Sequence, residues 1–249
     1  MKVAIFSDVH GNSIALDALL AEIADLGGVN AYWVVGDLVA LGPDPTGCLQ
    51  RLMKLENALF VRGNTDRYTL TGELSASLPV VSDNMPLADV QQVLEMSRSF
   101  AWTRGAVSAA NAYDWLAAIP VEQRITLPDG TRVLVVHAAP GTDDGTGILA
   151  EMPDDELAGM VQGTEADLII VAHTHQPLDR TVNGVRILNL GCTALPLLAE
   201  RRAMWTLLEA DESGYTLERR LTPYNVAGVI QAIDDSHHPQ AEWLKSRYA

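Results

Sequence analysis

The sequence predicts an α/β fold: a four-layer αββα sandwich in which two mixed β-sheets are flanked by helices, with a helical cap insertion. The first 64 residues alternate strand-like and helix-like patterns in the order β-α-β-α-β, which favours parallel strands. The second half contains two hairpin signals, Pro128-Asp129-Gly130 and Asn183-Gly184, which favour antiparallel strands. Two sheets that face each other satisfy both patterns.

The elements of the first half are defined by apolar residues and by the residues that end them. Residues 2–7 form a short apolar run that ends at Asp8, which is typical of a buried strand. Residues 13–26 carry apolar side chains at helical spacing until Gly27-Gly28, which stops the helix. Further strands are expected over residues 32–35 and 58–62, and between them a helix that follows a Gly/Pro loop and ends near Glu56.

Residues 66–120 interrupt this pattern and are interpreted as a helical cap within a single domain that spans residues 1–249. Residues 66–84 look like a loop, and residues 85–118 look rich in helix. The insertion is too short and too interrupted to hold a core of its own, so we expect it to be part of the same domain.

Strands are expected to return after the cap and to run mainly antiparallel. The last three predicted strands, near residues 186–190, 203–209 and 215–221, look sequential and antiparallel. His237-His238 lies in a polar stretch of the tail, so both imidazoles are expected to be exposed to solvent. The other elements expected here are strands over residues 123–127, 132–136 and 167–171, and helices near residues 153–162, near 225–233 and after Pro239.

The chain is acidic, with a formal net charge of -15 and a pI of about 4.6. An acidic surface disfavours long nucleic acids as partners, but it allows a small phosphorylated substrate held by a local metal charge. No stretch approaches about 18 apolar residues, so no membrane span is expected. Two distant cysteines, Cys48 and Cys192, and an N-terminus that opens directly on a strand predict a cytoplasmic protein. Exposed cap or tail surfaces could pair, so a homo-oligomer stays open.

Residues that can bind metal ions follow the predicted strands at the points where the strands end. Ligands of open α/β sheets bind outside the carboxyl ends of the strands, so these side chains are expected to meet at one edge. In Asp8-x-His10 and His173-x-His175 the paired side chains of an extended chain point the same way. The seven residues are Asp8, His10, Asp37, Asn64, His137, His173 and His175.

This set of donors predicts two divalent transition-metal ions. Mixed imidazole and carboxylate ligation suits Mn, Fe, Zn, Co or Ni better than Ca or Mg, with Mn favoured. Seven ligands are too many for one ion and suit two ions about 3.5–4 Å apart. Asp37 is expected to bridge them, because a carboxylate has lone pairs for two metals. A single histidine after a strand is more often a surface or capping residue, so the prediction depends on the joint pattern.

The same residues resemble the motifs of the calcineurin-like metallophosphoesterase superfamily, and most of all its bacterial and archaeal phosphodiesterase-like branch with short loops. The matching blocks are Asp8-Val9-His10-Gly11-Asn12, Gly36-Asp37, Gly63-Asn64, His137 and Ala172-His173-Thr174-His175. The resemblance implies that one metal is held by Asp8, His10, Asp37 and His175. It implies that the other is held by Asp37, Asn64, His137 and His173, and that Asn64 also contacts a phosphate oxygen.

The activity implied by the resemblance is hydrolysis of phosphate esters, as a phosphodiesterase or phosphatase that acts on a small phosphorylated molecule or nucleotide. A hydroxide that bridges the two metals would attack the phosphorus. Asn64 is expected to stabilise the phosphate oxygens together with Arg62 and Arg67, although a surface salt bridge is an equally good interpretation of each arginine. The leaving-group proton would come from His10 or from a metal-bound water.

One departure from the family pattern bears on the substrate. The superfamily commonly has a histidine after the Gly-Asn pair, where it can protonate the leaving group, and this chain has Thr65. A threonine hydroxyl does not titrate near neutrality, so we expect substrates whose leaving group is already a good anion, such as phenol diesters and pyrophosphate links. The alternatives are a non-catalytic protein-interaction scaffold on the same fold and a different binuclear hydrolase such as an amidase.

Overall fold

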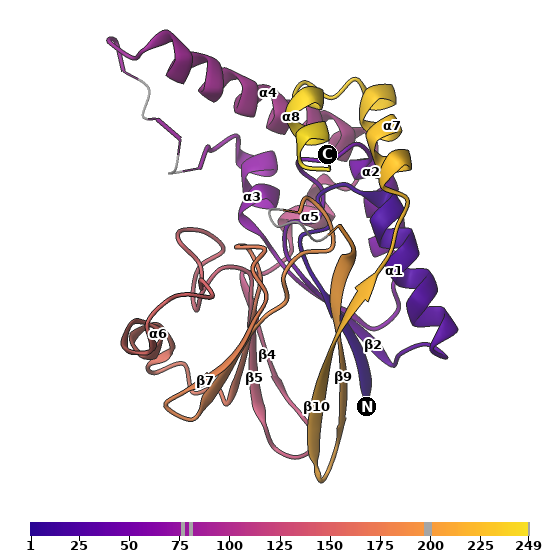
Figure 1. Ribbon diagram of the computed structural model, residues 1–249, viewed down its shortest axis with the longest axis vertical. Coiled ribbons are helices and arrows are strands. Elements are labelled where there is room, and N and C mark those ends of the chain that lie inside the picture. Colours follow the sequence, from indigo (N-terminus) through magenta and orange to yellow (C-terminus); the bar gives the residue numbers. More distant parts are fainter. Residues whose placement is uncertain (76–77, 80–81, 197–200, 249) are drawn as a thin grey trace.

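Two five-stranded β-sheets face each other in the computed structural model, which describes residues 1–75, 78–79, 82–196 and 201–248 (Figure 1). Helices cover the outer faces of the sheets, and another group of helices lies beyond one end of the strands, at the top of Figure 1. The predicted αββα sandwich is therefore confirmed.

The first sheet has the strand order β10-β9-β1-β2-β3. The three strands of the first half are parallel, as predicted, and β9 and β10 extend the sheet as antiparallel strands. Helices α1 (Ser13–Asp25) and α2 (Pro45–Leu52) connect the parallel strands, and α2 ends before the predicted Glu56. The strands are β1 (Lys2–Phe6), β2 (Ala31–Val35), β3 (Ala58–Val61), β9 (Ala203–Asp211) and β10 (Gly214–Thr222).

The second sheet has the order β4-β5-β6-β8-β7. Of the last three predicted strands, β9 and β10 are sequential and antiparallel as expected, and the prediction is wrong for β8. The three inner strands of the second sheet, β5, β6 and β8, are parallel, whereas β9 pairs with β1 of the first sheet instead of β8. The chain passes from the second sheet to the first after β8. The N–H groups of Thr193 and Ala194 fix this passage, because they donate to the carbonyls of Ser7 and Asp8. The strands are β4 (Glu122–Thr126), β5 (Arg132–Val136), β6 (Leu168–Val171), β7 (Leu178–Val182) and β8 (Val185–Asn189).

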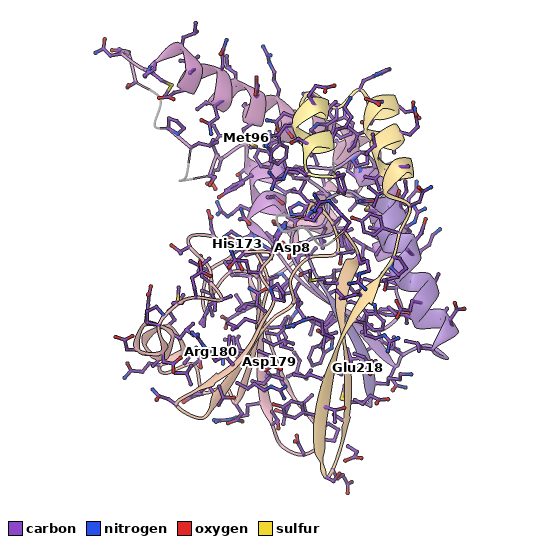
Figure 2. All side chains as sticks on the ribbon, viewed as in Figure 1. Asp8, Met96, His173, Asp179, Arg180 and Glu218 are labelled. Carbon is purple, nitrogen blue, oxygen red and sulfur yellow. The ribbon has the colours of Figure 1, made fainter. Side chains whose placement is uncertain are left out.

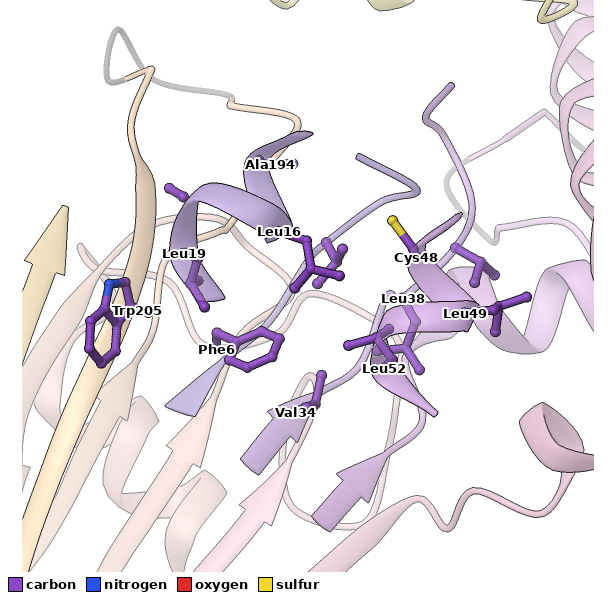
Figure 3. Close-up of a cluster of buried hydrophobic side chains, with 14 of the residues drawn as sticks. Phe6, Leu16, Leu19, Val34, Leu38, Cys48, Leu49, Leu52, Ala194 and Trp205 are labelled. Atoms are coloured by element: carbon purple, nitrogen blue, oxygen red, sulfur yellow. The ribbon is translucent and has the colours of Figure 1, made fainter. Parts of the chain in front are cut away.

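Alternation of side chains along the strands builds the layers. In β1, Val3 and Ile5 point into the core between the two sheets, whereas Ala4 and Phe6 point to the opposite face, against α1 and α2. Figure 3 shows this outer core, in which Phe6 lies close to Leu16 and Leu19 of α1. Helix α6 (Asp154–Val161) covers the outer face of the second sheet. The layers hold the carboxyl ends of the central strands of both sheets at the same end of the molecule.

The cap begins with a helix where a loop was predicted. Helix α3 (Asn64–Thr71) starts directly after Gly63, and the carboxylate of Asp66 accepts the N–H groups of Gly63 and Leu38. Asn, Thr and Asp favour turns in isolation, which explains the wrong prediction, but here Asp66 caps the helix and ties it to the loop after β2. Residues 76–77 and 80–81 of the predicted loop lie outside the described residues.

The predicted helix-rich part of the cap is confirmed as α4 (Leu87–Ala109) and α5 (Tyr113–Ala117). The tail forms α7 (Val226–Ser236) and α8 (Ala241–Ser246), close to the predicted positions. Cap and tail share a hydrophobic cluster, which we call the cap–tail cluster. Its buried members are Ala40, Leu41, Tyr68, Phe100, Leu195, Val229, Ile233, Leu244 and Tyr248.

The expectation of two solvent-exposed tail histidines is half wrong. His237 is exposed, whereas His238 is only 3% exposed. The imidazole of His238 contacts Ser99 Oγ at 3.2 Å and stacks edge-on against Trp102, so it connects the tail to the cap. Among the helices that the structure describes, none is long and apolar enough to cross a membrane.

Candidate metal centre

The seven predicted metal-binding residues meet at one end of the sandwich. Figure 2 labels Asp8 and His173 at this end, where β1 and β6 terminate. A continuous chain of short contacts connects all seven side chains, which come from both sheets and from the start of α3. Only His173 is partly exposed, and the other six are buried.

The backbone is held in a sparsely populated conformation at most of these positions. Asp8, His10, Asp37, His173 and His175 all have positive φ angles between 45° and 67°. A non-glycine residue in this region carries strain of about 1–3 kcal/mol, and such residues concentrate at functional sites. Five strained residues within one set of contacts indicate that the fold places these side chains at a cost to its own stability.

Three of the residues form what we call the Asp8 cluster: Asp8, His10 and His175. His10 and His175 each donate Nδ1–H to a backbone carbonyl, that of Ala40 and that of Leu195 respectively, both at 2.9 Å. Both Nε2 atoms therefore present lone pairs, and they lie only 3.2 Å apart. The Oδ1 atom of Asp8 lies 3.2 Å from His175 Nε2, and neither carboxylate oxygen of Asp8 has a hydrogen-bond partner among the described residues. Three buried acceptors that face one another fit a cation.

Three others form what we call the Asn64 cluster: Asn64, His137 and His173. His137 donates Nδ1–H to the Val35 carbonyl at 2.8 Å, so its Nε2 faces Asn64 Oδ1 at 3.2 Å. His173 has the opposite tautomer, because its Nε2–H donates to the Gly145 carbonyl and its Nδ1 faces the same Asn64 oxygen at 3.0 Å. Again three acceptor atoms converge, which fits a second cation.

Asp37 lies between the two clusters. Its Oδ1 accepts the N–H of Thr65 at 2.9 Å. Its Oδ2 lies 3.6 Å from His10 Nε2 and 3.5 Å from His137 Nε2, so one oxygen faces a histidine of each cluster. Ligand atoms of Asp8, His10 and His175 lie within 4.8 Å of one another, as do those of Asp8, Asp37 and His137. The geometry thus fits the bridging position expected for Asp37.

The two carboxylates keep their charge at neutral pH. Burial raises the pKa of Asp8, but the neighbouring His175 outweighs it, so the pKa of Asp8 lies below its usual value. Burial likewise raises the pKa of Asp37 and the neighbouring His137 lowers it, and the net shift is downward. Burial lowers the pKa of His137, yet the Asp37 carboxylate overrides it and raises this pKa to about 9, so a cation must displace a proton from Nε2 to use its lone pair. Two ionised carboxylates in a buried site provide the negative charge that divalent cations need.

Residues 1–213 match the model of the calcineurin-like phosphoesterase superfamily domain. The chain belongs to this superfamily. The match includes both sheets up to the end of β9 and all seven residues of the candidate metal centre. It leaves β10, α7 and α8 outside.

Similar proteins include both archaeal and bacterial members. An uncharacterised protein of Methanocaldococcus jannaschii is 25% identical over 262 residues, which covers 98% of this chain and 96% of that protein. A symmetrical bis(5'-nucleosyl)-tetraphosphatase of Pectobacterium carotovorum is 30% identical over 139 residues, which covers 55% of this chain and 43% of that enzyme.

Two solved structures cover nearly all of the chain. A metallophosphoesterase from Sphaerobacter thermophilus has a TM-score of 0.75 and 25% identity, with 100% of this chain and 98% of that chain covered. A hypothetical protein from Pyrococcus horikoshii OT3 has a TM-score of 0.81 and 18% identity, with 98% and 96% covered. The fold of this phosphoesterase family member is thus shared across its whole length.

Arg62 and Arg67, the predicted substrate-binding arginines, are both paired with carboxylates. Arg62 contacts Asp143 at 2.9 Å, and Arg67 contacts Asp143 at 3.1 Å and Asp144 at 2.8 Å. Arg67 also pairs with Glu73. The structure therefore places both guanidinium groups in one ion-pair network, which agrees with the salt-bridge interpretation.

Sequence reasoning missed the loop that supplies these carboxylates. Asp143, Asp144 and Gly145 lie after β5, and the Gly145 carbonyl sets the tautomer of His173. An acidic pair within a glycine-rich loop, a few residues after His137, is the signal that could have drawn attention to it.

Thr65 stands where many superfamily members are expected to have a histidine. Its hydroxyl is buried and has no hydrogen-bond partner within the described part of the chain. The neighbouring Asp66 is also buried, and burial together with the Asp37 charge raises the pKa of Asp66 to about 7. Asp66 accepts two backbone N–H groups, so its place is at the start of α3 and not among the facing ligand atoms.

Proposed function

We propose that this protein is a binuclear metal-dependent hydrolase of phosphate esters that acts on a small phosphorylated molecule or nucleotide. The observation that carries the proposal is the pair of acceptor clusters with Asp37 Oδ2 between them. Divalent transition-metal ions, with Mn as the first candidate, would supply Lewis acidity toward phosphate and lower the pKa of bound water.

Each protein group has a defined part in this proposal. Asp8, His10 and His175 would hold one ion, and Asn64, His137 and His173 would hold the other, with Asp37 available to both. The carbonyls of Ala40, Leu195, Val35 and Gly145 hold the four imidazoles in the tautomers that direct a lone pair at the metal. Both ring nitrogens of His10 are engaged in this way, so we assign it to metal binding and leave the leaving-group proton to solvent.

The substrate class in the proposal is a nucleotide or another molecule with a good leaving group. Thr65 offers no titrating group for a leaving alkoxide, which favours pyrophosphate links and activated diesters. A bis(5'-nucleosyl)-tetraphosphatase, whose name states a substrate with phosphate–phosphate links, is among the similar proteins. Arg62 and Arg67 would contact such a phosphate only after exchanging part of their contact with Asp143 for it.

Hydrolysis by metal-reconstituted protein tests this function. Purified protein is loaded with Mn, Co, Ni, Fe or Zn and incubated with bis-p-nitrophenyl phosphate, p-nitrophenyl phosphate and dinucleoside polyphosphates. We expect metal-dependent turnover that is lost in Asp37→Ala and kept in Asp167→Ala, a matched change of an exposed aspartate that pairs with Arg132. Absence of turnover with every metal and substrate would overturn the proposal, and turnover of amides alone would change the class of reaction.

A further inference from the structure

The tail packs on one half of the candidate metal centre. Helices α7 and α8 lie outside the part of the chain that matches the family model, and Figure 1 shows them at the same end of the molecule as α2 and α4. Their side chains Val229, Ile233 and Leu244 are fully buried in the cap–tail cluster. The same cluster includes Ala40 and Leu195.

Ala40 and Leu195 are the two residues whose carbonyls orient the histidines of the Asp8 cluster. His10 donates to the Ala40 carbonyl and His175 to the Leu195 carbonyl. The histidines of the Asn64 cluster depend instead on Val35, in the core between the sheets, and on Gly145. Tyr68 of the cap–tail cluster interacts with Asn64, but the hydrogen bonds of the tail residue Tyr248 go to Leu195 and Asn12, on the side of the Asp8 cluster.

The backbone next to these carbonyls is strained and needs to be held. Leu195 has a φ of 53° and Leu41, which follows Ala40, has a φ of 66°. Both are non-glycine residues in the left-handed region, which persist only where surrounding contacts over-determine them. The cap–tail cluster buries both side chains and so provides such contacts.

Tyr248 makes the most specific of the tail contacts. Its side chain is 4% exposed, and its hydroxyl oxygen accepts the Leu195 N–H and the Asn12 side-chain N–H, both at 3.2 Å. The Oδ1 atom of the same Asn12 caps α1 at Ala15 N. One phenol oxygen thus fixes the strained Leu195 peptide and the loop that carries His10.

We infer that Tyr248 is a positioning residue for the Asp8 cluster, through which the tail holds His175 and His10 in the orientation that binds metal. The inference rests on the proposed function, because it assigns the tail a role in binding one of two ions. It predicts that the tail affects the two metal sites unequally.

Metal titration of Tyr248→Phe tests this role. The variant keeps the buried ring and removes only the oxygen. We expect the affinity of the Asp8 cluster for metal to fall by about tenfold, as is typical when a group that orients a metal ligand is removed. The affinity of the Asn64 cluster should stay unchanged. The matched control is Tyr113→Phe, which removes a hydroxyl that donates to the Leu70 carbonyl in the cap, and both of its sites should bind as in the wild type.

Imidazole nitrogen NMR signals of the metal-free protein provide the second readout. In Tyr248→Phe the Nδ1–H signal of His175 should shift or broaden, while that of His137 stays unchanged. Equal weakening of both metal sites, or unchanged titration and unchanged His175 signals, would overturn the inference. If the wild type binds no metal, the proposed function fails, and the His175 signals still decide whether Tyr248 positions this imidazole.

Discussion

The Asp8 cluster and the Asn64 cluster contain similar donors in different surroundings. The Asp8 cluster is buried, its histidines are held by Ala40 and Leu195, and tail residues share a hydrophobic cluster with those two residues. The Asn64 cluster includes the partly exposed His173, which is held by Gly145 in a loop that also carries Asp143. The two halves therefore differ in burial and in what holds their histidines, so under the proposed function solvent and substrate would reach the half that contains His173.

Removal of one histidine from each cluster is expected to have the largest effect. His175→Ala should lose the ion of the Asp8 cluster, and His173→Ala the ion of the Asn64 cluster, because each removes a lone pair directed at a different site. Hydrolysis should fall by more than about 100-fold in both, since even groups behind the ligands are worth 10–100-fold. Elemental analysis and phosphodiesterase assays measure both effects, with the exposed His237→Ala as control. Loss of both ions in both variants would show that the clusters are not separable.

Substitution of Gly36 by alanine should displace the imidazole of His137, which belongs to the Asn64 cluster. A Cβ atom there would lie 2.4 Å from His137 Nδ1, and the φ of Gly36 is +79°. Overpacking and backbone strain together should lower the free energy of unfolding of Gly36→Ala by about 2–4 kcal/mol. Denaturant unfolding and metal titration measure the loss of stability and of the His137 site.

The control for this change is Gly130→Ala. Gly130 has a similar φ of +91°, but none of the described residues lies within 4 Å of the added atom. It should lose only about 1 kcal/mol, from backbone strain alone. Equal losses in the two variants would mean that the contact with His137 is unimportant.

The free energy of unfolding that His238 of the tail contributes should decrease as the pH falls. Burial lowers the pKa of His238 from 6.5 to about 4, so the folded state resists protonation that the unfolded chain accepts. The contribution of neutral His238 to stability is complete above pH 6.5, is lost as the pH falls to about 4, and amounts to at most about 3 kcal/mol.

Unfolding of His238→Gln across this pH range measures the effect of the buried imidazole. The variant should lose less stability than the wild type between pH 6.5 and pH 4, whereas His237→Gln should follow the wild type. The same pH dependence in all three proteins would exclude a role for His238.

Weakening the ion pairs of Arg62 and Arg67 should have the smallest effect on hydrolysis. Asp143→Asn removes the charge that both Arg62 and Arg67 contact. If these arginines meet substrate phosphate, KM should fall by about fivefold, equivalent to about 1 kcal/mol, with metal content unchanged. Steady-state kinetics against the Asp167→Asn control measure it, and an unchanged KM would assign the arginines to structure alone.

The sequence predicted the sandwich and the meeting of the seven candidate ligand side chains because both depend on local patterns. Each ligand directly follows an apolar strand, and the ends of neighbouring strands meet in space whatever the connections between them. The strand order of the second half could not be predicted from local patterns, because the hydrogen bonds of Thr193 and Ala194 with Ser7 and Asp8 decide which sheet β9 joins.

Tertiary contacts decided the features that were mispredicted. Helix α3 exists because Asp66 caps it and accepts Leu38 N–H, a residue distant in sequence. His238 is buried because the cap supplies Ser99 and Trp102. In both cases the local sequence is polar, and only a partner from another element makes the observed state favourable.

A crystal structure of the manganese-loaded protein, with anomalous scattering at the manganese edge, tests the central claim most directly. The account predicts two anomalous peaks per chain, one among Asp8, His10 and His175 and one among Asn64, His137 and His173, with Asp37 in contact with both. A single peak, or none after reconstitution, would contradict it.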